Sequence, residues 1–268
     1  MSHKDVGGRR LKLQVALGRT LRVLPLLWQG AVGALLLCAV LWLAPVVWAP
    51  SGGLVWLWGL LVAVSTVVAV GALARLSISD TLSEARALGL GPIGLQAKLP
   101  EARLVGAALL CLLFLAMILS ILGLVVLAIF GMAELNVQAI QARNWAGVGE
   151  PWKLGVLAIL AIGAVAIPLL LTVRLSLFVP ATLGRRQMVS LNSMGIAYGS
   201  FWPILGGLIL TALPKILLLI LIGTGLLSGV VAQIVWVVGL VGLQLPLTLG
   251  FLGAAYRQLE YWSPDEPR

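Results

Sequence analysis

The apolar stretch that decides the fold runs from Leu104 to Met132 and reads LVGAALLCLLFLAMILSILGLVVLAIFGM. Its 29 residues include no charged side chain. About 20 apolar residues cross the hydrocarbon core of a bilayer as a helix, and a helix satisfies its own backbone hydrogen bonds in lipid. The stretch therefore predicts a transmembrane helix.

Five other stretches of the chain have the same character. The six apolar runs occupy residues 29–49, 53–74, 104–132, 154–173, 201–226 and 230–256. Of the 268 residues, 61% are hydrophobic and 10% are charged, whereas a soluble domain has about 25% charged residues. The sequence predicts an all-α, polytopic membrane helical bundle. Short uncharged breaks at 50–53 and 227–229 favour an arrangement of the six transmembrane helices as three hairpins.

Lysine and arginine are unevenly distributed among the segments between these runs. With six spans, fifteen fall on one side, only Arg143 and Lys153 fall on the other, and Lys215 lies inside a span. The positive-inside rule then places both termini in the cytoplasm. The predicted domains are a basic amphipathic cytoplasmic segment (1–28), a six-span membrane domain (29–256) and a cytoplasmic tail (257–268). The first apolar run is longer than the roughly 7 to 15 residues of a secretory signal core, so we expect it to be retained.

Two surface helices are expected between the spans. Arg9, Lys12, Arg19 and Arg22 fall on one side of a helical wheel, which predicts a helix lying on the inner membrane surface. Residues 80–91 start with Thr81 and Glu84 at the spacing of a capping box and end in a Gly-Leu-Gly-Pro sequence, which predicts a short helix.

Tryptophans occur near the predicted ends of the spans, as in the aromatic belts of membrane proteins. Seven of the ten tryptophans are assigned in this way. Trp48, Trp56, Trp58, Trp145 and Trp152 lie at the predicted outer interface, and Trp28 and Trp202 lie at the inner one.

An arginine follows each even-numbered span, at Arg75, Arg174 and Arg257. This pattern fits a threefold repeat of two-span units, and it fits equally well with chance in a chain rich in Gly, Ala and Leu. Arginines at such positions are expected to extend toward lipid headgroups.

Groups that carry catalysis or hold metals are nearly absent from the predicted spans. No Asp or Glu lies deep in any of them, and the single histidine, His3, lies in the N-terminal segment. The sequence therefore predicts no catalytic residue, no cofactor and no metal site, and favours a protein that is not an enzyme. Cys38 and Cys111 are expected as buried thiols within apolar runs.

Lys215 is the exception among the ionisable residues, because it follows Pro214 inside the fifth apolar run. Ionisable residues within a membrane often have functional roles. Its ammonium could contact a counter-ion or substrate, or it could snorkel from a broken helix to the membrane surface. Gln233 and Gln244 in the last run could pair with it.

The segment after the fourth run carries a family resemblance. Residues 174–181, RLSLFVPA, are followed by Ser193 and by Gly199-Ser200-Phe201-Trp202. This order resembles bacterial multi-span families of the YciC type and the membrane domain fused to some glycerophosphodiester phosphodiesterases. In those families an Arg and a Pro-Ala leave one span, and a Ser, a Gly and a Phe-Trp precede the next. The candidate motif residues are Arg174, Pro180, Ser193, Gly199 and Trp202.

The resemblance implies a fold and a place in the bacterial cytoplasmic (inner) membrane. It implies no activity, because the chemistry of the fused enzymes belongs to a separate soluble domain. Met194 departs from the family pattern, in which an aromatic residue often follows the serine.

Two functions are compatible with these features. The preferred one is a non-enzymatic scaffold or lipid-organising protein, whose partners are membrane lipids with anionic headgroups at the cytoplasmic face and a protein yet to be identified. The alternative is a transporter or channel for an anionic or lipidic solute, with Lys215 as its contact. The net charge of +9 does not point to nucleic acid, because the basic residues adjoin apolar runs, as membrane orientation requires.

Overall fold

The computed structural model defines residues 10–48, 50–134, 136–148 and 150–260. The predicted segments at the two ends of the chain lie partly outside these ranges, including His3, Arg9 and residues 261–268. Within the defined ranges the chain forms helices and turns and no strand. Six helical segments are long and apolar enough to cross a membrane, which confirms the predicted all-α, six-span fold. They are Leu13–Val47, Gly53–Ile78, Pro92–Met132, Pro151–Gly184, Phe201–Gly223 and Gly229–Leu259.

The chain divides into two compact units. Unit 1 contains the residues up to Ala108 and those from Arg174 onward, and unit 2 contains Leu109–Val173.

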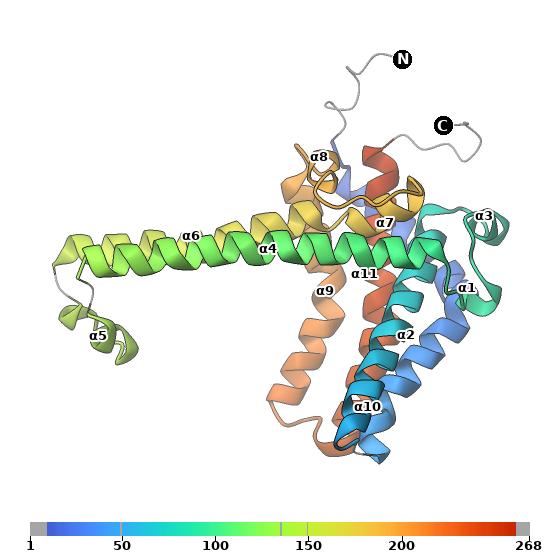
Figure 1. Ribbon diagram of the computed structural model, residues 1–268, viewed down its shortest axis with the longest axis horizontal. Helices are drawn as coiled ribbons and strands as arrows, with labels where there is room; N and C mark the ends of the chain where they lie inside the picture. Colours follow the sequence, from blue (N-terminus) through green and yellow to red (C-terminus); the bar gives the residue numbers. More distant parts are fainter. Residues whose placement is uncertain (1–9, 49, 135, 149, 261–268) are drawn as a thin grey trace, which may run out of the picture. The chain divides into compact units, whose positions relative to one another are not determined.

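Three helices form the centre of unit 1. They are α1 (Leu13–Val47), α2 (Gly53–Ile78) and α11 (Leu245–Leu259), and each packs against the other two (Figure 1). The turn after Val47 makes α1 and α2 a tight hairpin, as predicted. The fifth span, α9 (Phe201–Gly223), packs against α11.

The first span is longer than predicted, because α1 is one continuous helix of 35 residues that starts at Leu13. The expected N-terminal surface helix is therefore not a separate helix in the defined part of the chain. Pro25 lies inside α1 and removes only one backbone hydrogen bond. Thr20 and Leu27 on either side of it are buried and adjoin Gly250 of α11, so packing holds the helix together across the proline.

The short helix predicted after the second span is present as α3 (Leu82–Ala87). Thr81 caps it by accepting a hydrogen bond from the Glu84 N–H at 3.2 Å, and the Glu84 carboxylate accepts one from the Asp80 N–H at 2.6 Å. The chain leaves α3 through Gly89, whose φ of +92° favours glycine. The capping-box prediction is thus confirmed. The Glu84 carboxylate accepts the N–H of Asp80, one residue before the N-cap Thr81, and not that of Thr81 itself.

Two short helices lie between α6 (Pro151–Leu175) and α9. α7 (Phe178–Gly184) packs against α2 and α11, and its residues from Val179 onward are buried. A Cβ atom at Gly184 would lie 2.8 Å from the ring of Tyr256, so glycine permits this close approach. α8 (Ser193–Ile196) follows and precedes α9.

The last span contains a local change of helix type. It starts as α10 (Gly229–Val238), widens into the π-helical segment η3 (Gly239–Gln244) and continues as α11. Pro246 has no N–H to donate to the carbonyl of Gly242, four residues earlier. The indole Nε1–H of Trp28 on α1 donates to that carbonyl instead, at 2.7 Å. The predicted interfacial Trp28 therefore completes the hydrogen bonding of a distorted helix.

Several glycines in unit 1 mark the closest contacts between its helices. A Cβ atom at Gly207 on α9 would lie 1.9 Å from the Phe251 ring of α11, and one at Gly253 would lie 2.1 Å from Ser77 Oγ on α2. By contrast, nothing lies within 4 Å of such an atom at Gly195, Gly225 or Gly229. The spacing of small residues alone does not identify the contact points.

Unit 2 comprises the part of α4 (Leu99–Met132) from Leu109 onward, α5 (Val137–Gln141), the 3₁₀ turn η2 (Trp145–Gly147) and most of α6 (Pro151–Leu175). Three of its buried residues, Ala133, Ala139 and Val148, form a small cluster beside α5, with Phe130, Ile140 and Val156 packed around them. In the third span only 6% of the most apolar window is buried. Its apolar side chains therefore require lipid or protein neighbours to cover them.

Candidate functional site

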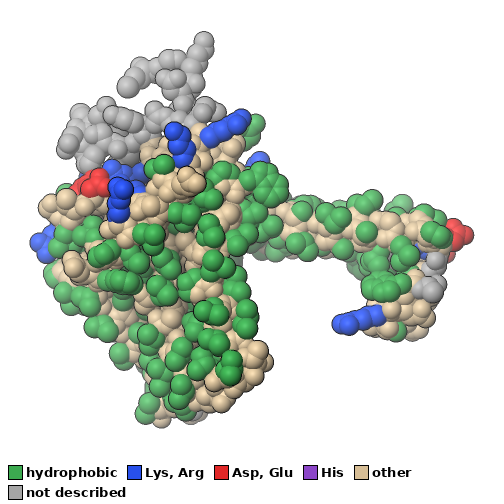
Figure 2. Space-filling model, turned by 180° about the vertical axis from the view of Figure 1, so that it is seen from behind, with side chains coloured by type: hydrophobic (Ala, Val, Ile, Leu, Met, Phe, Trp, Pro, Cys, Tyr) green, Lys and Arg blue, Asp and Glu red, His purple; other side chains and the backbone are tan. Residues whose placement is uncertain are grey.

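The charged residues of unit 1 gather at one end, which we call the basic end. It is the end where α1 begins, where α2 and α11 finish, and where α3, α7 and α8 lie. It carries every Lys and Arg of the defined part of unit 1 except Lys215, twelve in all, against four Asp and Glu. Figure 2 shows these basic side chains gathered above a largely hydrophobic surface. The turns at the opposite end, near Val47 and Gly223, carry no charge.

Both ends of the defined chain meet at the basic end. The Lys12 N–H donates to Oε1 of Gln258 at 3.0 Å, and the Leu11 N–H donates to the hydroxyl of Ser200 at 3.1 Å. The start of α1 is therefore tied to the end of α11 and to the segment that precedes α9.

A three-residue ionic cluster joins α1, α2 and α11 there. Asp80 accepts Arg19 through one carboxylate oxygen and Arg257 through the other, each at 2.8 Å. Arg257 also donates to the carbonyl of Ile78 at 3.0 Å, and Arg19 to that of Ser79 at 3.4 Å. These carbonyls are at the C-terminal end of α2, where cations are stabilised. The cluster thus caps one helix with side chains from two others.

The two arginines also control the ionisation of Asp80. Partial burial acts to raise the pKa of its carboxyl, but the positive charges and hydrogen bonds of Arg19 and Arg257 outweigh this, so the pKa lies below its ordinary value of 3.8. Asp80 therefore stays charged, and the cluster keeps a net positive charge.

A second ion pair is almost completely buried. Arg75 of α2, 1% exposed, lies 2.6 Å from the carboxylate of Glu101 in the first turn of α4. Arg75 Nε donates to the Leu88 carbonyl at 3.2 Å, and Glu101 accepts the Lys98 N–H at 3.0 Å. A Cβ atom at Gly71 would lie 3.1 Å from the Glu101 carboxylate, so this glycine makes room for the pair. The pair joins α2 to the start of α4.

The buried ion pair corrects one interpretation. Arg75 does not extend to the membrane surface, and Arg257 is likewise engaged by Asp80. Glu101 lies in the first turn of α4 and neutralises Arg75. In the sequence, the feature that could have indicated this pair is Gly71. It lies one turn before Arg75 on the same face of the helix, because residues four apart share a helix face, and it leaves space for the ion pair.

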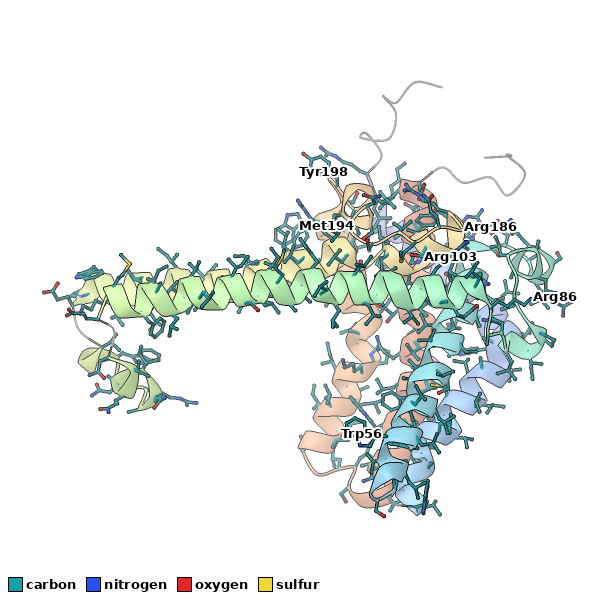
Figure 3. All side chains as sticks on the ribbon, viewed as in Figure 1. Trp56, Arg86, Arg103, Arg186, Met194 and Tyr198 are labelled. Carbon is teal, nitrogen blue, oxygen red and sulfur yellow. The ribbon has the colours of Figure 1, made fainter. Side chains whose placement is uncertain are left out.

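The remaining arginines of the basic end have no carboxylate partner among the defined residues, apart from Arg185, which lies 2.5 Å from Glu260. Arg103 donates to the carbonyl of Arg186, and Arg186 donates to that of Ala87 at 3.4 Å. Figure 3 shows Arg86, Arg103 and Arg186 on this part of the surface. Their charges are therefore available to an external anion.

Exposed apolar and aromatic side chains accompany these arginines. After Arg186 and up to the first turn of α9, the surface presents Met188, Leu191, Tyr198 and Trp202, the last of them 76% exposed. Tyr198 is labelled in Figure 3. Basic side chains beside exposed aromatic ones are typical of a membrane–water interface. Trp56, labelled in the same view, is exposed near the start of α2.

The predicted motif residues occupy different environments within residues 174–202. Pro180 is buried in α7, and the buried hydroxyl of Ser193 donates to the Ser190 carbonyl at 2.7 Å and toward that of Leu175 at 3.5 Å. Arg174 is half-buried, Gly199 has φ of +76°, and Trp202 is exposed. Ser193 and the end of α6 are thus brought together, while Trp202 faces outward.

Lys215 lies on the exposed surface of α9 and has no hydrogen bond or ion pair with a defined residue. The expected glutamine partners are engaged elsewhere or exposed. Gln244 donates to the Thr248 hydroxyl at 2.8 Å, and Gln233 is on the surface of α10. The predicted pairing of Lys215 with these residues is therefore not formed.

Other chemistry-bearing side chains are isolated in the defined part of the chain. Cys38 and Cys111 are free buried thiols, as expected from their apolar surroundings. No three His, Cys, Asp or Glu side chains of the defined residues are grouped so that they could hold a metal ion.

Comparison with protein-family models, with curated proteins and with solved structures finds no match to this chain.

Proposed function

We propose that this protein is a non-enzymatic integral membrane protein that organises anionic lipids at its basic end. The observation that carries the proposal is the surplus of twelve basic over four acidic side chains at one end of unit 1. Internal ion pairs engage Asp80, Glu101 and Glu260, so these carboxylates cannot neutralise the other arginines.

The charge distribution also supports an orientation. Basic residues next to transmembrane helices favour the cytoplasmic leaflet, which carries anionic lipids. In the proposed orientation the basic end, and with it both chain termini, lies in the cytoplasm. The resemblance of residues 174–202 to YciC-type proteins supports a place in a bacterial inner membrane.

The test compares lipid selectivity between two charge-matched variants. Arg22→Gln with Arg86→Gln removes two exposed arginines that form no ion pair with a defined residue. Each basic residue near an anionic surface contributes about 1 kcal/mol, so enrichment of phosphatidylglycerol over phosphatidylcholine around the purified protein should fall by roughly ten- to thirtyfold.

The control, Arg143→Gln with Lys153→Gln, removes the same charge from unit 2 and should leave the enrichment near the wild-type value. Equal losses in both variants, or none in either, would contradict a lipid-organising role of the basic end.

A second candidate function is transport of an anionic or lipidic solute. Only one observation favours it, which is the exposed, unpaired Lys215 in the fifth span after Pro214.

A further inference from the structure

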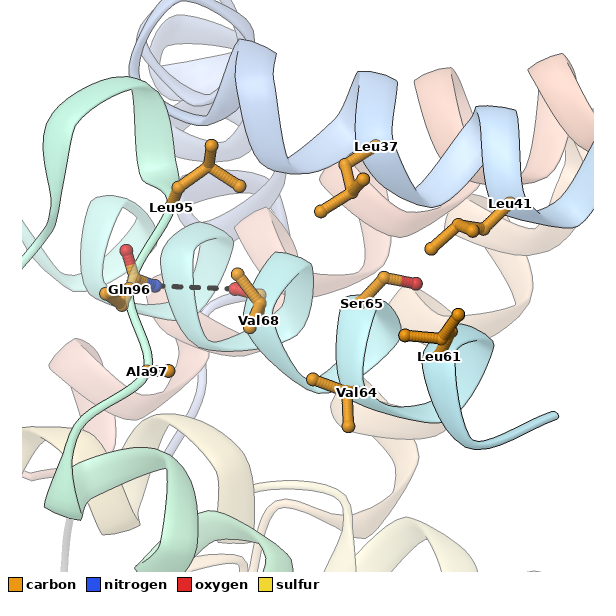
Figure 4. A pocket seen from close by; sticks show the side chains of 9 residues that line it. All are labelled: Leu37, Leu41, Leu61, Val64, Ser65, Val68, Leu95, Gln96 and Ala97. Atoms are coloured by element: carbon orange, nitrogen blue, oxygen red, sulfur yellow. Dashed lines mark hydrogen bonds between the residues drawn. The ribbon is translucent and has the colours of Figure 1, made fainter. Parts of the chain in front are cut away.

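An apolar groove of about 480 Å³ lies between α1 and α2 (Figure 4). Leu37 and Leu41 of α1 form one wall, and Leu61 and Val64 of α2 form the other. The segment Leu95–Ala97 closes one end. These helix residues lie within the first and second spans, so the groove is formed by the membrane-spanning helices themselves.

The polar side chains in the lining are already engaged. Gln96 accepts a hydrogen bond from the Gly91 N–H at 3.1 Å and donates to the Val68 carbonyl at 3.4 Å, drawn as a dashed line in Figure 4. The Ser65 hydroxyl donates to the Val62 carbonyl at 2.9 Å. A polar ligand would find few partners here, whereas a hydrocarbon chain leaves all these bonds intact.

The closed end of the groove is tightly packed against α1. A Cβ atom at Gly33 would lie 2.6 Å from the Ile93 side chain, and one at Gly94 would lie 2.7 Å from the Cα atom of Ala31. The loop that closes the groove is therefore held by backbone-to-backbone contact, and the groove is formed before any ligand arrives.

A basic residue, Lys98, adjoins this closed end along the chain. Lys98 follows Ala97 and is exposed. The nearest carboxylate along the chain, that of Glu101, is already paired with buried Arg75. The Lys98 ammonium is therefore free to meet a phosphate, at the same end of unit 1 where the other basic residues gather.

We propose that the groove binds one phospholipid, with an acyl chain between α1 and α2 and the phosphate beside Lys98. A basic residue at the end of a largely apolar groove favours a phospholipid over a second copy of the chain or another protein helix, which would not require a cation at the groove end. The acyl chain leaves the hydrocarbon of the bilayer for the apolar lining of the groove, so no hydrophobic gain is expected. Packing against a preformed surface therefore supplies the affinity. The inference depends on the membrane location and on none of the arginines used to test the proposed function.

The test is native mass spectrometry of the full chain, purified in a mild detergent and incubated with dipalmitoylphosphatidylglycerol. The wild type should retain one lipid after most detergent is removed. Val64→Trp fills the groove and should reduce the retained fraction at least several-fold. Leu60→Trp, on the same helix but outside the groove and 61% exposed, should retain the lipid like the wild type.

Two further variants make the outcome decisive. Leu37→Trp fills the groove from α1 and takes the place of Val64→Trp if that variant fails to fold, as judged by its thermal unfolding. Lys98→Gln should lower retention of phosphatidylglycerol, whereas Lys98→Arg should restore it. The arginine variant Arg22→Gln with Arg86→Gln should leave this single lipid bound, so failure of one proposal is distinguishable from failure of the other.

Equal retention by Val64→Trp, Leu37→Trp and Leu60→Trp would overturn the inference. So would a wild-type dimer, without retained lipid, that both groove-filling variants convert to monomer, because the occupant would then be a second copy of the chain.

Discussion

Arg75 on α2 and Glu101 at the start of α4 form a 2.6 Å ion pair from which water is almost excluded. Breaking such a pair by removing one partner leaves an unpaired buried charge and costs about 3 to 5 kcal/mol. Replacing both partners by apolar residues removes both charges and their desolvation penalties.

We therefore expect Glu101→Leu to destabilise the protein strongly and the double variant Arg75→Leu with Glu101→Leu to recover most of the loss. Unfolding of the detergent-solubilised protein by a denaturing detergent measures both. A double variant as unstable as the sum of the two single variants would show that the charges are not energetically coupled.

Trp28→Phe should destabilise the protein by about 1 kcal/mol, because it leaves the Gly242 carbonyl without its donor. In a Pro246→Ala background the restored N–H of residue 246 can serve that carbonyl, so the same replacement should cost less. The measurement is a double-mutant cycle on unfolding free energy, with exposed Trp56→Phe as the neutral control. If Trp28→Phe lowers the unfolding free energy equally with and without Pro246→Ala, the Trp28 hydrogen bond does not compensate for the N–H that Pro246 lacks.

Stability should depend on pH through Asp80. Its pKa is lower in the folded protein than its ordinary value of 3.8, so its contribution is complete above that value and is lost as the pH falls through the lower, folded pKa. Because the side chain is 55% exposed, solvent screening limits the effect to about 1 kcal/mol. The thermal unfolding temperature, measured from pH 6 down to the lowest pH at which the protein is still folded, should show this loss. In the Asp80→Asn variant the unfolding temperature should depend less on pH over the same range.

Two adjacent glycines on α9 should respond differently to replacement by alanine. At Gly207 a Cβ atom would lie 1.9 Å from the ring of fully buried Phe251, whereas at Gly206 the nearest atom, in Leu13, is 3.6 Å away. Overpacking of this kind costs about 1 to 3 kcal/mol. Thermal unfolding should therefore show a loss for Gly207→Ala and none for Gly206→Ala, and similar effects would contradict close contact between α9 and α11.

Lys215→Met should leave lipid selectivity unchanged and preserve or improve membrane insertion, because a lysine inside a span is costly. Insertion efficiency and phosphatidylglycerol enrichment measure these two effects. If a solute flux is found in reconstituted vesicles and Lys215→Met abolishes it while insertion is intact, the transport function replaces the lipid-organising one.

The arrangement of the spans follows largely from local sequence. Runs such as 104–132 and the Thr81–Glu84 capping box act through contacts a few residues apart, so their spacing alone predicts helices and a helix start. The continuous α1 was less predictable, because the expected surface helix and the first span merge into one helix in which Thr20 and Leu27 are buried against α11.

The candidate sites were harder to predict, because each joins residues far apart in the chain. Asp80 meets Arg257 across 177 positions, and Arg75 meets Glu101 across 26. Arg174 has no carboxylate partner among the described residues. In the local sequence, only the glycine one turn before Arg75 distinguishes Arg75 from Arg174.

The sequence by itself determined that the chain is a six-span helical membrane protein with its basic residues segregated, because apolar length and charge are local properties that lipid and water act on directly. Only the tertiary structure decided which of those charges are neutralised inside the protein and which remain exposed. It also decided that α1 and α2 enclose an apolar groove. Both depend on the close approach of helices at Gly71, Gly33 and Gly94, which is set by packing over the whole unit and not by any single segment.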